Sequence, residues 1–183
     1  NENSVEGIYS QIFDPEGVKI GDEILSYSSD KTNNSPQVLK LDDGFLNVWQ
    51  QQYYNSNEYD WGYRAIGQRH DADGNHVGES FLVSDIFSSS YISGTTLKNG
   101  DVVIGWQTEQ VVMTYEYKFY ARIYNLSDNG ELIPKGDPFL INETRSDYPN
   151  INSGNVEQRL SLSALENGGF VATWRSNDIT QLE

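Results

Sequence analysis

The sequence contains no cysteine, and this absence removes three kinds of chemistry at once. Without thiols the chain has no disulfide framework, no thiolate metal site and no cysteine nucleophile. It also lacks any apolar run approaching the ~18 residues of a membrane-spanning helix, so we expect no membrane insertion. No stretch shows sustained helical apolar periodicity, which leaves β-strands as the elements that build the fold.

Lysine and arginine are scarce: 12 basic residues stand against 27 acidic ones, for a net charge of -15. Phosphate backbones and anionic lipid surfaces are bound mainly through Lys and Arg. The composition therefore argues against nucleic acid and against membrane surfaces as partners. An acidic surface suits divalent cations, a saline exterior or simple solubility, and solubility is the default interpretation.

Aromatic residues are what the chain has in quantity. Tyr, Trp and Phe make up 13% of the sequence, although only 37% is hydrophobic. This balance suits thin antiparallel sheets with large aromatic plugs, and it excludes a disordered chain. A length of 183 residues fits one domain with a substantial core. The sequence therefore predicts a single all-β domain.

A unit of about 57 residues recurs along this chain and organises it. The aligned pairs in its first two copies, each offset by 57 residues, are Gln11 with Gln68, Gly17 with Gly74 and Gly21 with Gly78. A third copy begins at residues 120–125 and contains a few inserted residues. The segment that closes each unit ends in tryptophan and recurs at residues 41–49, 97–106 and 165–174.

The repeat predicts three four-stranded antiparallel blades of the β-propeller type within one domain, residues 1–183. We place the units at roughly 36–92, 93–141, and 142–181 joined with 7–35, so that the two termini complete one unit. A chain that opens in mid-unit is expected to be part of a longer protein. Propellers usually need about four to eight blades. Three units could instead close as a β-trefoil or a β-prism, and two chains could form a six-bladed homodimeric ring.

Tryptophan recurs at one position of every unit, as Trp49, Trp106 and Trp174. A large aromatic residue that returns in each unit is typical of a core plug, and we prefer this interpretation to a stacking platform for a ligand.

Residues 50–63 are too polar for a core strand and unusually aromatic for a loop, so we expect a long strand extension or a projecting connection. Aromatic residues on a connection can stack on sugar rings or anchor a protein partner. Packing over a neighbouring sheet edge is the slightly favoured structural interpretation. The candidate ligand-binding residues are Tyr53, Tyr54, Tyr59, Trp61 and Tyr63.

Residues 71–75, Asp-Ala-Asp-Gly-Asn, are the best metal candidate. Alternating oxygen ligands followed by glycine match the start of a calcium loop, with Asp71 and Asp73 as ligands. Glu79 arrives too early to be the bidentate glutamate of such a loop. Asp-Gly between two strands is also a common hairpin turn, and this structural interpretation is the stronger one.

His70 and His76 flank the same turn and could share a metal with Asp71 or Asp73, but we expect hairpin neighbours with solvated rings. Ser-His-Asp sets and paired carboxylates for glycoside hydrolysis can be drawn from so many residues, yet no nucleophile-elbow sequence supports them. We therefore expect no enzymatic activity, and a polysaccharide-active hydrolase is the minority alternative.

Residues 8–17 with the later Gly21, and residues 168–174, resemble the repeats of very long secreted bacterial proteins of the repeats-in-toxin (RTX), haemolysin-type calcium-binding or adhesin-like kind. The resemblance covers nearly the whole chain and rests on structural motifs. It implies a repeat-built β module at a secreted or cell-surface location, with no reaction attached. The Gly-Gly-x-Gly-x-Asp nonapeptide of the calcium-binding β-roll does not occur in the sequence, so calcium ligands do not carry over.

Together these observations predict a non-catalytic binding or spacer module of a large secreted or cell-surface protein. Its expected partner is a host or matrix glycan or a protein ligand. The alternatives are a polysaccharide-active hydrolase and a calcium-stabilised structural module. Calcium is the one cofactor that the sequence suggests.

Overall fold

In the computed structural model every regular element of the described chain is a β-strand, and the strand pairings are antiparallel. The described residues are 5–55, 60–84, 90–112, 114–127, 131–142, 146–147 and 160–174. Within them no helix is long and apolar enough to cross a membrane. The expected all-β class and antiparallel pairing are confirmed.

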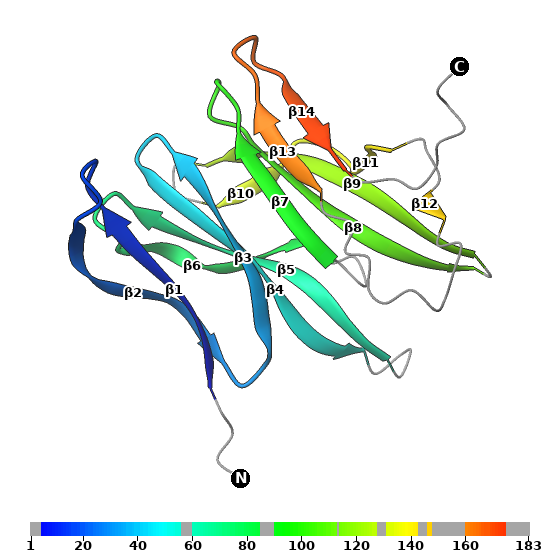
Figure 1. Cartoon of the computed structure of the whole chain (residues 1–183), viewed down its shortest axis with the longest axis horizontal. Coiled ribbons are helices and arrows are strands. Elements are labelled where there is room, and N and C mark those ends of the chain that lie inside the picture. Colours follow the sequence, from blue (N-terminus) through cyan, green and yellow to red (C-terminus); the bar gives the residue numbers. More distant parts are fainter. Residues whose placement is uncertain are drawn as a thin grey trace.

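The strands form four sheets that follow one another along the chain, and we call them sheets I to IV (Figure 1). Sheet I is the hairpin of β1 (Glu6–Phe13) and β2 (Lys19–Ser29). Sheet II contains, in order, β3 (Asn33–Leu41), β4 (Gly44–Asn55), β5 (Asp60–Asp71) and β6 (His76–Ser84). Sheet III contains β7 (Ser90–Thr96), β8 (Val102–Val112), β9 (Thr114–Leu126) and β10 (Leu132–Pro134), and β9 also pairs with β11 (Phe139–Leu140) and β12 (Ser146–Asp147). Sheet IV is the hairpin of β13 (Ser161–Ala164) and β14 (Phe170–Thr173).

Two hairpin turns, β1–β2 and β5–β6, are built in the same way. Asp14 Oδ1 accepts hydrogen bonds from the amides of the residues two and four positions later, at 3.0 and 2.7 Å. Asp71 Oδ1 does the same, at 3.0 and 2.8 Å. Gly17 and Gly74 then take φ of 81° and 89°, a conformation that side chains other than glycine rarely adopt. An aspartate at the start and a glycine three residues later therefore specify both turns.

A glutamine side chain closes the β-bulge that follows in each of these hairpins. Gln11 Nε2 donates to the carbonyls of Ile12 and Gly21, at 3.1 and 3.4 Å. Gln68 Nε2 makes the corresponding bonds to Arg69 and Gly78, at 2.9 and 3.2 Å. In sheet III, Arg122 Nε donates to Gly136 O at 2.7 Å at the aligned position. The aligned residues of the sequence thus make equivalent contacts.

The sheets stack face to face, so that sheets II and III are covered on both sides. Alternate residues of a strand point to opposite faces, which lets one strand serve two interfaces. The core between sheets II and III contains Leu39, Leu41, Leu46, Val48, Ala65, Val83, Ile92, Val102, Ile104, Trp106 and Tyr124. The core between sheets III and IV contains Leu97, Val103, Phe119, Ala121, Leu160 and Leu162. A third, small cluster between sheets I and II contains Ile8, Trp49 and Ile66.

The recurring tryptophans lie in these cores. Trp49 and Trp106 are among the largest fully buried side chains, which confirms their predicted role as core plugs. Trp174 is half-buried at the end of the chain's described part, where it packs with Phe119 at a ring-centroid distance of 6.5 Å.

The expected joining of the two termini is wrong for the described chain. Sheets I and IV are separate two-stranded sheets, and Figure 1 places them at opposite ends of the stack. The physical reason is that each sheet covers a face of the next one, so sheets II and III separate the two hairpins. The described strands therefore form an open row, without a closed propeller, trefoil or prism.

Candidate functional site

The aromatic stretch forms a two-stranded extension of sheet II. The pairing of β3 with β4 ends at Gln51, and that of β5 with β6 ends at Ala65. Beyond these residues β4 and β5 continue to pair with each other as far as Asn55 and Asp60. Figure 1 shows these two strands reaching past their neighbours. The predicted long strand extension is confirmed, and it projects a ribbon from the body of the sheet.

The register distributes the candidate ligand-binding residues over both faces of this ribbon. Tyr54 is opposite Trp61 and Gln52 is opposite Tyr63, so positions 54, 61 and 63 share one face, while Tyr53 belongs to the other. Tyr54 is 48% exposed, and Tyr53 and Tyr63 are half-buried. Tyr59 and the side chain of Trp61 lie outside what the structure describes. The ribbon thus brings Tyr54 and Tyr63 together and separates Tyr53 from them.

Arg64 joins the Tyr53 face and is the residue that sequence reasoning missed. Its guanidinium carbon lies 5.8 Å from the centroid of the Tyr53 ring, within the range of a cation–π contact. Its Nε and Nη2 donate to Gln51 Oε1 at 3.2 and 2.7 Å. Two bonds to one buried acceptor hold the guanidinium in place. The signal in the sequence was the run of three glutamines at 50–52, which is unusual in a strand.

A polar network beneath the ribbon anchors Gln51. Gln51 Nε2 donates to the hydroxyl of Tyr27 at 3.0 Å and to Asn33 Oδ1 at 3.2 Å. Asn33 Oδ1 also accepts from Trp49 Nε1 at 3.2 Å, and the Tyr27 and Trp49 rings pack at 4.9 Å. Tyr27 belongs to sheet I, so this network connects both sheets to the root of the ribbon. Buried polar networks that are satisfied in this way fix a single geometry.

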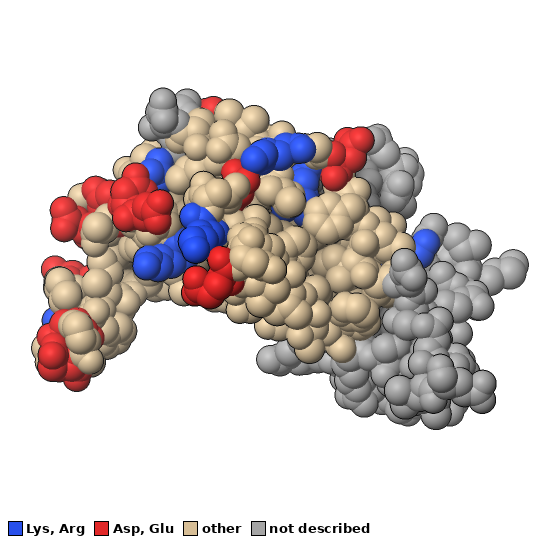
Figure 2. Space-filling model, turned by 90° about the horizontal axis from the view of Figure 1, so that it is seen from above, with Lys and Arg blue, Asp and Glu red and all other residues tan. Residues whose placement is uncertain are grey.

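The candidate metal residues belong to a hairpin turn. Asp71 Oδ2 accepts from Asn75 Nδ2 at 2.9 Å while Oδ1 caps the turn, and the Asn75 hydrogen bonds hold the pKa of Asp71 below its usual value. Asp73 is exposed. The described residues contain no group of three or more His, Asp or Glu that could hold a metal. Figure 2 shows several groups of Asp and Glu on the face seen from above, most of them toward the left of the view, where sheet I lies in Figure 1. This geometry supports the hairpin interpretation.

The expectation of solvated histidine rings is wrong for His70. His70 is fully buried, and its ring stacks on Phe45 at 4.7 Å and meets His76 edge-on at 4.9 Å. Its Nδ1 lies 3.1 Å from Gly74 O, so Nδ1 carries the proton and donates. Burial lowers the pKa of His70 and keeps the ring neutral. The reason for the burial is that sheet I covers this turn: Ile24 lies directly against Gly74. His76 is exposed, as expected, and Nε2 contacts Leu25 O at 3.1 Å.

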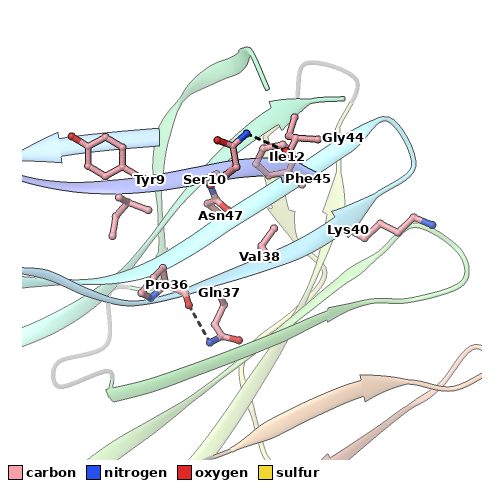
Figure 3. Close-up of a pocket in the computed structure, with 12 residues that line it drawn as sticks. Tyr9, Ser10, Ile12, Pro36, Gln37, Val38, Lys40, Gly44, Phe45 and Asn47 are labelled. Carbon is pink, nitrogen blue, oxygen red and sulfur yellow. Dashed lines mark hydrogen bonds between the residues drawn. The ribbon is translucent and has the colours of Figure 1, made fainter. Parts of the chain in front are cut away.

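A groove of about 540 Å³ lies between β1 and the hairpin of β3 and β4 (Figure 3). At its base Asn47 Nδ2 donates to Ser10 Oγ and Ser26 Oγ, at 2.7 and 2.8 Å. The walls are largely apolar, and Lys40 is the one charged residue among those that line it. The groove therefore offers apolar surface and strand edge for binding, rather than acid–base groups.

No protein-family model, curated protein or solved structure matches this chain.

Proposed function

We propose that this chain is a non-catalytic binding module that holds a glycan on the β4–β5 ribbon, as part of a large secreted or cell-surface bacterial protein of the RTX or adhesin-like kind. The observation that supports the proposal is one face of the ribbon, which carries half-buried Tyr53 beyond the body of sheet II, with the Arg64 guanidinium carbon 5.8 Å from its ring centroid. Aromatic faces stack on sugar rings, and neighbouring polar groups orient the hydroxyls.

The same face of the ribbon supplies such polar groups in fixed positions. Arg64 is held against Tyr53 by two hydrogen bonds to Gln51. Because these side chains are ordered before any ligand arrives, less conformational entropy is lost on binding. Planar guanidinium donors also suit carboxylate or sulfate groups of acidic sugars. An acidic glycan is therefore the preferred class of ligand.

A glycan array followed by affinity measurement tests the proposal. Tyr53→Ala is expected to weaken the best ligand at least tenfold, since a stacked aromatic contributes over about 1.4 kcal/mol. Leu82→Ala is the matched control, because Leu82 is 50% exposed on β6 of the same sheet, and it should leave affinity unchanged.

Three outcomes contradict the proposal: no glycan binds, Tyr53→Ala binds as tightly as the unaltered chain, or a protein ligand binds the ribbon instead. Turnover of a glycan that one Asp or Glu substitution abolishes would show that the chain is a hydrolase.

A further inference from the structure

Sheets I and IV each have the local geometry of one half of a four-stranded sheet. Sheet I makes at Gln11 the amide contacts that Gln68 makes in the third and fourth strands of sheet II. Sheet IV has the turn that joins the first two strands of sheet III. The shared backbone bonds are Leu97 N to Asp101 O and Gly100 N to Leu97 O in one turn, and Leu165 N to Gly169 O and Gly168 N to Leu165 O in the other. A sheet IV hairpin followed by a sheet I hairpin would therefore supply, in order, the equivalents of all four strands of a complete sheet.

Side chains on the outer strand of sheet I are exposed where their equivalents are buried. Tyr9 is 62% exposed and Phe13 is 54% exposed on β1. The aligned residues on β5 are Ile66 and His70, which are both buried beside β4. An uncovered strand edge with exposed aromatic residues favours the addition of another strand.

The outer face of sheet IV has the same property. Val171 is 45% exposed and Leu165 is also exposed, whereas the aligned Leu46 and Leu41 of sheet II are buried against sheet III. These exposed residues lie on β1, on β14 and directly after β13. In the described chain β1 and β14 each pair on one side, whereas their aligned strands in sheet II, β5 and β4, pair on both sides.

The registers of the complete sheets predict one pairing between β14 and β1. The relevant pairs are Trp49 with Ile66 and Val48 with Gly67 in sheet II, and Trp106 with Tyr120 and Gly105 with Ala121 in sheet III. Transferred through the aligned residues, both registers place Trp174 opposite Tyr9. Both also place Thr173 opposite Ser10. The registers of sheets II and III thus predict the same pairing of β14 with β1.

Residue sizes in the groove agree with this pairing. Between sheets II and III, Leu39 packs so closely on Gly94 that a Cβ there would lie 2.7 Å from Leu39 Cδ1. The aligned positions that would meet when sheet IV covers β3 are Ser163 and Val38. Here the small residue, Ser163, is on the covering strand β13. The large residue, Val38, is 66% exposed and lines the groove. The exchange of large for small keeps the combined volume similar, as close packing requires.

We infer that two copies of this chain complete each other: β14 of one copy pairs with β1 of its partner, and β13 fills the partner's groove between β1 and β3. One copy cannot pair its own two hairpins, because sheets II and III hold them at opposite ends (Figure 1), so the partner that we infer is a second copy. Two such junctions produce a closed ring of six four-stranded sheets, within the range of about four to eight that propellers use. This interface is separate from the glycan ribbon and does not depend on it.

Engineered cysteines test the register directly, because the chain has no cysteine of its own. Ser10→Cys and Thr173→Cys chains, mixed and oxidised, are expected to form one intermolecular disulfide, since residues directly opposite in an antiparallel pair have suitable spacing. Phe13→Cys mixed with Thr173→Cys is the control, because Phe13 lies three positions beyond Ser10, roughly 10 Å along the strand. Circular dichroism verifies that each variant is folded.

Light scattering of the unaltered chain should give twice the mass of one chain from micromolar concentrations upward. Val171→Lys places a charge on the sheet IV face, where it is solvated in a single copy, and should raise the dissociation constant at least tenfold. Ile133→Lys, on exposed β10 of sheet III, should leave it unchanged. A single-copy mass at every concentration, assemblies larger than two copies, or equal crosslinking of the control pair would each overturn the inference.

Discussion

Sheet II has two interfaces of opposite character, although both use the same strands. Toward sheet III it presents leucine, valine and alanine; the Tyr124 hydroxyl donates to Val83 O at 2.7 Å inside that core, and Thr96 Oγ1 donates to Lys40 O at an exposed position. Toward sheet I it presents Asn47, Trp49 and Gln51, each hydrogen-bonded to other side chains. Alternation along β4 produces this division. The apolar interface supplies burial, and the polar interface supplies a fixed geometry.

The difference has a functional consequence, because the ribbon grows from the polar side. Gln51 connects Tyr27 of sheet I with Arg64 of the ribbon. Apolar packing alone tolerates many arrangements of similar volume, whereas satisfied buried polar groups select one. Hydrogen-bonded polar groups beneath a binding surface can therefore hold an aromatic and a cationic side chain together in one arrangement.

The largest expected effect comes from breaking the apolar interface. Trp106→Ala removes a fully buried ring between sheets II and III, and should lower the free energy of unfolding by about 3 to 5 kcal/mol, as large aromatic truncations do. Chemical denaturation at a fixed protein concentration measures it, with Ile133→Ala as the exposed control. A loss under about 1 kcal/mol would place Trp106 outside the core.

Breaking the polar interface should cost less and act locally. Asn47→Ala leaves the buried hydroxyl of Ser26 and that of Ser10 without their amide donor, which costs about 1 to 3 kcal/mol. Amide hydrogen exchange should rise in β1 and β2 more than in sheet III. Gln37→Ala, an exposed amide in the same sheet, is the control. Uniform acceleration across all sheets would show that the two interfaces are one cooperative unit.

Buried His70, on the polar side of sheet II, should make the free energy of unfolding depend on pH. Because burial lowers the pKa of His70, the unfolded chain binds the proton more readily, and stability falls as the pH drops through the usual histidine range. The slope for one proton is at most about 1.4 kcal/mol per pH unit. Asp71 titrates at lower pH, since hydrogen bonds lower its pKa.

Unfolding measured between about pH 5 and about pH 8 checks this dependence. His70→Phe should flatten the curve, because no proton is then taken up at this position. His76→Gln should keep most of the slope. An unchanged slope in His70→Phe would assign the titration to another group.

Calcium should have the smallest effect. If Asp71 and Asp73 only shape the turn, calcium should raise the thermal stability slightly and without saturation, because it merely screens a charge of -15. Sodium chloride at matched ionic strength should then have the same effect. A specific site would instead give about 2.7 kcal/mol at ~100 times the dissociation constant. Thermal melts with calcium, magnesium and sodium chloride distinguish the two. Loss of a saturable effect in Asp71→Asn with Asp73→Asn would establish a calcium site.

Local features of this fold were predictable from the sequence, because neighbouring residues determine them. The Asp14 and Asp71 turns follow from an acceptor and a glycine three residues apart. The antiparallel hairpins and the burial of Trp49 and Trp106 follow from alternation and recurrence. None of these depends on how distant segments meet.

The features that depend on distant contacts could not be predicted. His70 looked solvated because the residue that covers its turn, Ile24, belongs to another sheet. Arg64 was missed because its orientation depends on Gln51, whose own anchors are Tyr27 and Asn33. The termini were expected to meet because composition alone does not reveal that sheets stack in a row.

The most direct test of the account compares glycan affinity in Gln51→Ala with that in Val83→Ala. Gln51 lies beneath the ribbon on the polar side, whereas Val83 is buried on the apolar side. The account predicts that Gln51→Ala weakens the best array ligand at least tenfold by releasing Arg64, and that Val83→Ala lowers stability while affinity is retained. Full affinity in folded Gln51→Ala, or an equal loss in both variants, would contradict it.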